Sequence, residues 1–429
     1  MPPSASPPVP SRKLTIMVPS RNRAEMAQRT IQSLRAQDVP GLTIVVSDNS
    51  TDEREREQLA AACAELDDVH YLSPPGDLAM TDHWIWAFGR LRDDFSAPLV
   101  SMVTDRMVMR PGALTGLLEL AAAHPGRLVS YNHDAVDDRT TPVQLRLQDR
   151  SGRAFELSAE HLLQRCSHVY FHACIPRVMN CLVPQTVLDA VEERFGGLFA
   201  SISPDHCFGF RCLDVVDAII YFDACPLIHY ALARSNGASY ARGVSSPDAD
   251  DFQRHLGAVK MNASAPVPAF HSITNAVVNE YCFVRAEPPA HKLPALDSTR
   301  YLGAMARETA RLEDPDLRER MRRLLDEQGW SRIRPRYWLV RVRDVLELLL
   351  RRPRPFLRLL RITVADHVPP TLAALFGAGE RRRTFATTEQ ALTHLMATPT
   401  PAASTHVHLL PLLFPRGAAR EVPAPRGEP

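Results

Sequence analysis

The chain has 429 residues, of which 45% are hydrophobic and 23% are charged, and its formal net charge is +1. Domains usually contain ~100 to 200 residues, so this length predicts two folded units with tails. The composition is that of a soluble globular protein, and the near-zero net charge argues against nucleic acid as a partner.

Neither the cysteines nor the hydrophobic segments indicate export or membrane insertion. The eight cysteines contain no Cys-x-x-Cys pair, which favours reduced, buried thiols over a disulfide framework. The Pro/Ser-rich start of the chain lacks the apolar run of a signal peptide. No stretch reaches the ~18 apolar residues of a transmembrane helix. These features predict a cytoplasmic protein.

From residue 13 onward, short apolar strands alternate with amphipathic helices. Strands are predicted at 14–18, 42–47, 69–72, 98–103 and 218–222, and helices at 23–36, 51–66, 77–91, 111–123, 184–195 and 204–213. This alternation is typical of an α/β fold with a mostly parallel sheet flanked by helices. A smaller, mainly helical region is expected to follow, and its clearest helical pattern lies at 300–325.

An arginine-rich segment interrupts the composition near the C-terminus. Residues 332–361 contain ten arginines and two acidic residues, interleaved with Trp338 and a leucine run at 348–350. This mixture resembles an interfacial helix lying on an anionic membrane. The alternative is a basic helix that packs on the main domain.

These features predict five consecutive parts of the chain. They are a disordered tail at 1–12, the α/β domain at 13–245, a helical extension at 246–330, a basic amphipathic helical segment at 331–375, and a largely disordered Pro/Ala-rich tail at 376–429.

Two polar turns follow the first two predicted strands. Residues 15–23 are Thr-Ile-Met-Val-Pro-Ser-Arg-Asn-Arg, and residues 46–52 are Val-Ser-Asp-Asn-Ser-Thr-Asp. They resemble the opening of a family 2 glycosyltransferase of the GT-A fold, and the resemblance extends over residues 13–240. In that family both turns face the nucleotide of a nucleotide-sugar donor, as expected at the carboxyl ends of strands in an open α/β sheet.

The resemblance therefore implies a set of nucleotide contacts, namely Pro19, Ser20, Arg21, Asn22 and Asp48. Asp52 follows Ser50 and Thr51 at the start of a predicted helix, so we predict that it caps this helix rather than takes part in chemistry.

The segment Thr-Asp-Arg-Met at 104–107 lies where the family carries two or more aspartates for Mg²⁺ or Mn²⁺. Such an ion bridges the two phosphates of the donor and needs oxygen ligands, yet this chain offers only Asp105. One hypothesis is that Asp105 retains the metal with help from His229, and we favour it. In the second, Arg106 neutralises the leaving diphosphate directly. In the third, Arg106 only forms a salt bridge.

An inverting transferase needs a general base, and the segment Ser-Pro-Asp-His at 203–206 resembles the acidic motif that supplies it. The resemblance assigns this role to Asp205. The alternative is a helix-terminal aspartate that only interacts with the helix dipole. Arg234 is predicted to contact phosphate from the loop at 234–239, where a structural turn at Asn236-Gly237 is the alternative. Arg177 and Asn180 are assigned to the acceptor cleft.

The predicted function is inverting transfer of a sugar from a nucleoside diphosphate donor to a glycan or lipid-linked acceptor, in polysaccharide biosynthesis at the inner face of the cell membrane. The alternative is a degenerate GT-A domain that serves as a glycan-binding or scaffold subunit, which the missing aspartate supports. A nucleotidyltransferase is disfavoured because no Gly-rich phosphate loop follows the first strand. A hydrolase is disfavoured because Gly-x-Ser-x-Gly is absent.

Overall fold

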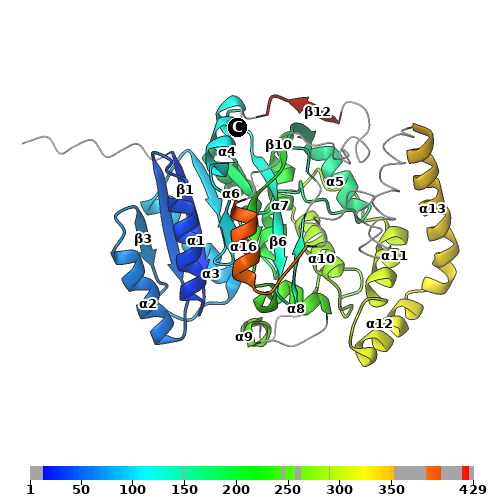
Figure 1. Cartoon of the computed structure of the whole chain (residues 1–429). Coiled ribbons are helices and arrows are strands. Elements are labelled where there is room, and N and C mark those ends of the chain that lie inside the picture. The colour runs from blue at the N-terminus through cyan, green and yellow to red at the C-terminus, as the bar shows by residue number, and fades with distance from the viewer. Residues whose placement is uncertain are drawn as a thin grey trace, which may run out of the picture.

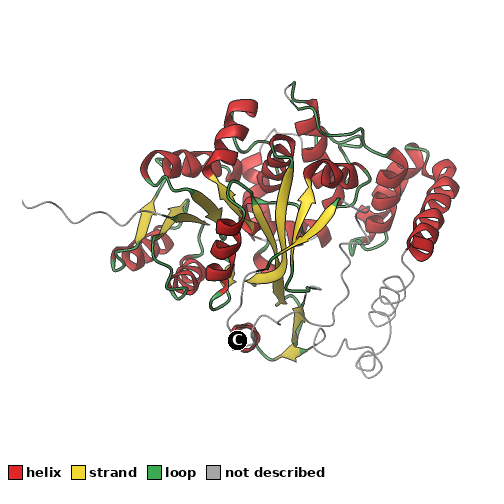
Figure 2. Cartoon of the chain, turned by 90° about the horizontal axis from the view of Figure 1, so that it is seen from above, coloured by secondary structure: helices red, strands yellow, loops and turns green. Residues whose placement is uncertain are grey.

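A computed structural model describes residues 13–147, 150–242, 247–256, 262–288, 290–351, 383–397 and 418–424 (Figure 1). The described strands form one continuous sheet with the order β12-β8-β10-β6-β9-β4-β1-β2-β3, to which β5, β7 and β11 pair separately. Helices cover both faces of this sheet (Figure 2). The layers are those of the α/β fold predicted from the sequence.

The N-terminal half of the sheet is parallel. It consists of β1 (Leu14–Ser20), β2 (Leu42–Asp48), β3 (Val69–Leu72) and β4 (Leu99–Met102). The intervening helices are α1 (Ala24–Arg35), α2 (Glu53–Ala64) and α3 (Met80–Asp94). In the β1/β2 register Ser20 lies opposite Asp48, so the two polar turns that follow these strands meet at one edge of the sheet.

The strand β1 is completely buried because its two faces enter different cores. Leu14, Ile16 and Val18 pack with side chains of α1, α2 and α4 (Ala113–Ala123). Met17 points to the opposite face, as the alternation of side chains along a strand requires. The second core contains side chains of α3, α5 (Ala159–Ser167), α6 (Gln185–Phe195), α7 (Pro204–Val215) and α10 (Ile273–Ala286).

The C-terminal half of the sheet is mixed. Its strands are β6 (Val129–Asp137), β8 (Ala154–Ser158), β9 (Cys181–Pro184), β10 (Ala218–His229) and β12 (Ala419–Val422). Among them β10 is parallel to β6 and antiparallel to β8. The far end of β10 pairs with β5 (Met107–Met109), where His229 lies opposite Met107. This pairing brings His229 to the carboxyl end of β4.

Helix α8 (Asn236–Arg242) ends the predicted α/β domain, and the helical extension comprises α9 (Pro247–Leu256), α10, α11 (Ser298–Thr309) and α12 (Pro315–Glu327). The sequence predicted one helical stretch at 300–325, and the structure divides it. Asp314 caps α12 by accepting hydrogen bonds from the amides of Asp316 and Leu317, and Pro315 occupies the first helical turn, where its missing N–H costs nothing.

The basic segment begins with α13 (Trp330–Arg351), and its continuation at 352–375 lies outside the described residues. One face of α13 packs on α11, where a Cβ atom added to Gly303 would lie 2.1 Å from the ring of Tyr337. Asp344 forms a two-pronged ion pair with Arg300 at 2.6 and 2.9 Å. Within the described part of the chain, no helix is both long and apolar enough to cross a membrane.

Within the tail at 376–429, residues 383–397 and 418–424 are described and include three regular elements. They are β11 (Thr384–Phe385), α16 (Thr388–Ala397) and β12. β11 pairs with β7 (Val143–Arg146), and β12 pairs with β8. The composition could not show this because the partner strands lie far away in the chain. The rest of this tail, like residues 1–12, lies outside the described residues.

A buried arginine ties α16 to the sheet. Arg110 is 1% exposed, pairs with Asp134 at 2.7 Å, and donates to the carbonyl oxygens of Cys225 and Leu395. Since Leu395 belongs to α16, one guanidinium joins three distant segments. Ala391, Leu392 and Leu395 complete the contact by packing on apolar side chains of β6 and β10.

We predict that Arg110→Met destabilises the protein by about 3 to 5 kcal/mol, because it leaves buried acceptors without their donor. Equilibrium urea denaturation measures this change in the free energy of unfolding. The matched control is Arg35→Met, which removes a half-exposed pair with Asp68 and is expected to cost less than about 1 kcal/mol. Equal effects of the two variants would contradict the role assigned to Arg110.

Candidate active site

A cleft of about 1230 Å³ opens at the carboxyl ends of the parallel strands. Its walls come from the turns after β1 and β2, the segment after β4, the start of α7, the end of β10, and helices of the extension. It is lined by nine of the ten predicted site residues: Pro19, Ser20, Arg21, Asn22, Asp105, Arg106, Asp205, His229 and Arg234. The tenth, Asp48, does not line it.

Asn22 joins the two nucleotide-type turns. Its backbone is left-handed, with φ of 52°, a conformation that asparagine tolerates better than most residues. Its side-chain oxygen accepts hydrogen bonds from the amides of Thr51 and Asp52 at 2.9 and 3.0 Å, and its own amide donates to Ser50 Oγ. Asp52 accepts hydrogen bonds from the first turn of α2, which confirms its predicted capping role.

Asp48 lies beneath the cleft rather than in its wall. It is fully buried, and its carboxylate accepts hydrogen bonds from the Ser50 amide and the Tyr71 hydroxyl, both at 2.9 Å. Burial, with the Asp48 charge as the next cause, raises the pKa of Tyr71, so this hydroxyl stays a donor. The geometry favours a positioning role for Asp48 over the direct nucleotide contact expected from the sequence.

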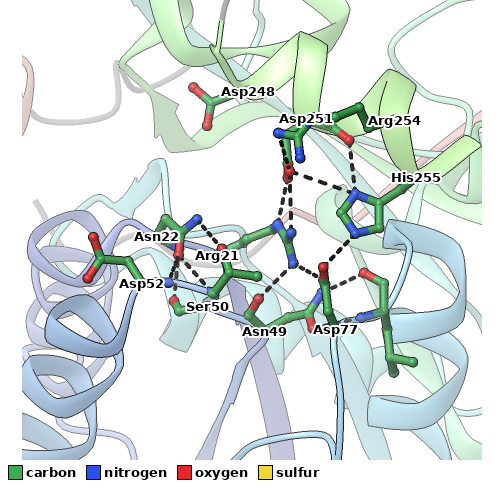
Figure 3. A network of polar contacts seen from close by, with 12 residues as sticks. Arg21, Asn22, Asn49, Ser50, Asp52, Asp77, Asp248, Asp251, Arg254 and His255 are labelled. Carbon is green, nitrogen blue, oxygen red and sulfur yellow. Dashed lines mark hydrogen bonds and ion pairs between the residues drawn. The ribbon is translucent and has the colours of Figure 1, made fainter.

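Helix α9 contributes to the wall of the cleft and contacts the turn after β1 through Arg21 (Figure 3). Arg21 pairs with Asp251 of α9 at 2.7 Å and with Asp77 at 2.6 Å. Arg234 pairs with Asp248 of α9 at 3.1 Å. The ring of His255, also from α9, lies 2.9 Å from Asp77. These carboxylates therefore form ion pairs with guanidinium groups to which an anionic ligand would otherwise bind.

We predict that Asp251→Asn strengthens the binding of a nucleoside diphosphate, because Arg21 no longer has a competing carboxylate on α9. A partly exposed ion pair contributes up to about 1 kcal/mol, so the dissociation constant is expected to fall by up to about fivefold. Isothermal titration calorimetry with UDP and GDP measures it.

The control for this prediction is Asp316→Asn, which removes a carboxylate from the same cleft without removing an ion pair to Arg21. Weaker binding by Asp251→Asn alone would show that α9 forms part of the ligand site instead of competing with the ligand.

Positive charge gathers around the single aspartate after β4. Asp105 is 1% exposed, and its Oδ2 lies 3.0 Å from Arg23 Nε. Next to it, Arg106 Nη1 lies 3.1 Å from His229 Nε2. Burial is the largest cause that holds the pKa of His229 well below its usual value, and the positive charge of Arg106 is the next. The imidazole is therefore neutral, and Nε2 accepts the Arg106 hydrogen bond. Burial also lowers the pKa of Arg106 to about 10, which leaves it protonated at neutral pH.

This arrangement does not fit the predicted Mg²⁺ or Mn²⁺ site. Those ions prefer several oxygen ligands, whereas Asp105 is flanked by two guanidinium groups. The lone pair of His229 Nε2 is already directed to Arg106. The part of the chain that the structure describes contains no group of three or more His, Cys, Asp or Glu side chains able to hold a metal ion. The geometry favours the second hypothesis, in which arginine supplies the charge.

Four buried polar atoms on the cleft floor accept or donate no hydrogen bond within the described residues. They are Ser20 Oγ, Thr104 Oγ1, Asp105 Oδ2 and Arg106 Nε; of these Asp105 Oδ2 has its ion pair with Arg23. An unsatisfied buried polar atom costs about 1 to 3 kcal/mol. Their grouping at the ends of β1 and β4 indicates a site prepared for a polar ligand.

Asp205 occupies the first turn of α7 and faces the cleft. Burial alone would raise its pKa, but His206, whose Nδ1 lies 3.2 Å away, and then Arg177 lower it to about 2. The carboxylate is therefore ionised at neutral pH and can accept a proton. Arg177 lines the cleft as predicted. Asn180 is buried and donates to the Tyr131 carbonyl, so its role is structural.

Sequence reasoning missed several residues of the cleft. Arg23 belongs to the first motif but was given no role, and the α9 side chains Asp248, Asp251 and His255 carry no recognisable motif. The Arg21–Asp251 contact joins positions 230 residues apart. Only the three-dimensional fold brings such segments together.

A polar cleft at the carboxyl ends of the strands is the place where open α/β sheets bind their ligands. Residues 15–178 match the model of glycosyl transferase family 2. This segment resembles family 2 glycosyltransferases, and the match confirms the resemblance seen in the polar turns.

Solved structures with a similar fold include residues 1–349 of TarS from S. aureus. The alignment with its complex with UDP-GlcNAc has 14% sequence identity and a TM-score of 0.44. It covers 76% of the present chain and 92% of the TarS chain. The alignment with its complex with UDP has 13% sequence identity and a TM-score of 0.43, and it covers 76% of the present chain and 91% of the TarS chain. No curated protein matches the chain.

Proposed function

We propose that the protein is an inverting glycosyltransferase that moves a sugar from a nucleoside diphosphate donor to a glycan or lipid-linked acceptor. The observation that carries this proposal is the group of unsatisfied polar atoms on the cleft floor. They lie at the carboxyl ends of the strands, where α/β sheets bind nucleotides. The family match supports the donor class.

The cleft has two ends with different chemistry. The nucleotide would lie against the turns that contain Arg21, Asn22 and Asn49. The acceptor would approach Asp205 at the start of α7. In the reaction, the acceptor hydroxyl transfers its proton to the Asp205 carboxylate while its oxygen attacks the anomeric carbon. The bond from that carbon to the diphosphate oxygen breaks on the opposite face, so the configuration inverts.

Guanidinium groups would take the place of a metal ion at the leaving group. Arg106 is protonated and largely buried, and its Nε–H has no hydrogen-bond partner among the described residues; Arg23 lies 3.0 Å from Asp105. Guanidinium groups bind phosphate oxygens with paired hydrogen bonds. Held in position before the reaction, they stabilise the charge that develops on the diphosphate without reorganisation.

We predict that Asp205→Asn lowers kcat by at least about 100-fold, because general-base catalysis contributes about 10² to 10⁴ in rate. The measurement is nucleoside diphosphate release with a panel of nucleotide sugars and acceptors. A matched control is Asp82→Asn, which removes another aspartate from a helical first turn, that of α3. Retained activity of Asp205→Asn would exclude it as the base.

The same assay tests the role of arginine. We predict that EDTA leaves turnover within about twofold of its value in Mg²⁺, whereas Arg106→Gln lowers kcat by about 100-fold or more, as loss of one electrostatic group at a developing anion does. Loss of activity in EDTA that Mn²⁺ restores would contradict the proposal. Nucleotide binding without turnover of any donor would favour the scaffold alternative.

We also propose that α13 rests on an anionic membrane surface, which would bring the cleft to a lipid-linked acceptor. The exposed apolar residues of this helix are Trp338, Leu339, Val342, Val345, Leu346 and Leu350. With about 100° per residue they fall on one arc of about 140°. The packed face, with Tyr337 and Asp344, points the other way, and α13 forms an outer edge of the molecule (Figure 1).

Arginines flank the apolar arc on both sides. Around the circumference of the helix, one edge of the arc is bordered by Arg334 and Arg341. The other edge is bordered by Arg332, Arg336 and Arg343. Long cationic side chains beside an apolar strip reach lipid phosphates while the strip enters the interface. Two copies of this helix would place like charges together, so the charge pattern favours anionic lipid over self-association.

We predict that Trp338→Ser combined with Leu346→Ser weakens co-sedimentation with phosphatidylserine vesicles by at least about tenfold, because two large apolar side chains are lost from the interface. Ile85→Ser is the control, since Ile85 is 48% exposed on α3, away from this face. Vesicle binding that the double substitution leaves unchanged, or a dimer in light scattering that it abolishes, would contradict the membrane assignment.

A further inference from the structure

A buried carboxylate of the helical extension lies directly behind the loop that carries Asp205. Glu280 belongs to α10 and is completely buried. It faces the loop at 201–203, the segment between α6 and α7 that ends one residue before Pro204 and two before Asp205. The family match ends at residue 178, so neither the loop nor Glu280 belongs to the matched segment.

One oxygen of Glu280 holds this loop at two points. Glu280 Oε1 accepts a hydrogen bond from Ser201 Oγ at 2.9 Å and one from the Ser203 amide at 3.1 Å. Its neighbour Asn279 donates to the same oxygen at 2.9 Å and to Ser201 Oγ at 3.1 Å. From the other side, Thr81 donates to the Ser201 carbonyl at 2.9 Å. The loop is therefore held between α10 and α3.

The loop needs such support because its own conformation is unfavourable. Ser201 has a left-handed backbone with φ of 63°, which costs on the order of 1 to 2 kcal/mol for a residue with a Cβ atom. Ser203 is the N-cap of α7, and its side chain makes no capping hydrogen bond. The bond from its amide to Glu280 thus fixes the residue from which α7, and with it Asp205, starts.

A carboxylate at this position is energetically expensive. Burial raises the pKa of Glu280 to about 7, and the Asp205 charge acts in the same direction. Its second oxygen, Oε2, has no hydrogen-bond partner within the described residues. The hydrogen bonds that its first oxygen accepts from the loop and from Asn279 offset part of this cost, so the glutamate stabilises the loop and not only the core.

We propose that Glu280 is a positioning residue for catalysis: it fixes the loop at 201–203 and thereby the placement of Asp205 at the acceptor side of the cleft. This inference rests on the proposed function of Asp205 as the base. It also gives the helical extension a part in the reaction, since α10 both lines the cleft, through Ile273, Ala276 and Val277, and holds the loop.

The test compares Glu280→Ala with Glu280→Gln in steady-state kinetics, together with binding of a nucleoside diphosphate. We expect Glu280→Ala to lower kcat by about 100-fold, because displacement of a catalytic group by about 1 Å has effects of that size. KM for the donor and the nucleotide dissociation constant are expected to change less than about twofold, since the nucleotide turns lie on β1 and β2. Glu280→Gln retains an oxygen acceptor and is expected to restore kcat to within about tenfold of wild type.

A matched control is Glu287→Gln. Glu287 ends the same helix and pairs with Arg211 of α7 at 2.5 Å. The substitution Glu287→Gln therefore perturbs the packing of the same two helices without removing a contact to the loop. The kcat of this variant is expected to equal that of the wild-type protein. A fall in kcat for Glu287→Gln as large as that for Glu280→Ala, at matched thermal stability, would overturn the inference.

The double variant Asp205→Asn/Glu280→Ala separates this inference from the function on which it rests. If Glu280 acts through Asp205, the double variant is expected to be no slower than Asp205→Asn alone, because residues that act as a unit are not additive. An active Asp205→Asn variant would refute the base assignment itself. With Asp205→Asn inactive, wild-type kcat in Glu280→Ala would refute only the positioning role.

Discussion

Buried positive charge at the carboxyl ends of β1 and β4 is the constraint on which the rest of the site depends. A protonated guanidinium cannot be removed from water without compensation, and Arg106 is held between a neutral imidazole and a single carboxylate. The antiparallel pairing of β5 with β10 creates this neighbourhood because it places His229 beside the segment after β4. Burial of this charge costs free energy of folding, which the burial of apolar side chains on both faces of the sheet offsets.

Aspartate side chains have different tasks in different parts of this structure. Asp48, Asp52 and Asp134 lie within the protein or cap a helix, and they shape the walls by accepting hydrogen bonds. Asp248 and Asp251 lie on α9 and hold arginines that face the cleft. The same chemical group therefore builds the site in one place and balances its charge in another.

The sequence predicted the parallel half of the fold well, because hydrophobic alternation and helix caps are local signals: Leu14–Ser20 and Glu53–Ala64 form where the patterns indicated. Nine of the ten site residues that it named line the cleft, since the motifs directly follow strands. It did not show that Asp48 is buried, because a motif does not tell whether its carboxylate points outward or into the protein. The sequence assigned no role to Glu280 or Asp251, because their hydrogen-bonding partners lie in other segments and no sequence spacing connects them.

The last described strand has a consequence for biosynthesis. β12 pairs with β8 so that Val422 lies opposite Ala154. Arg110 donates a hydrogen bond to the Leu395 carbonyl of α16, which is also synthesised late. Until those late segments leave the ribosome, the β8 edge is an open template for foreign strands, and Arg110 has not found all of its acceptors. The nascent domain is thus exposed to misassociation at this edge until residues 419–422 have been synthesised.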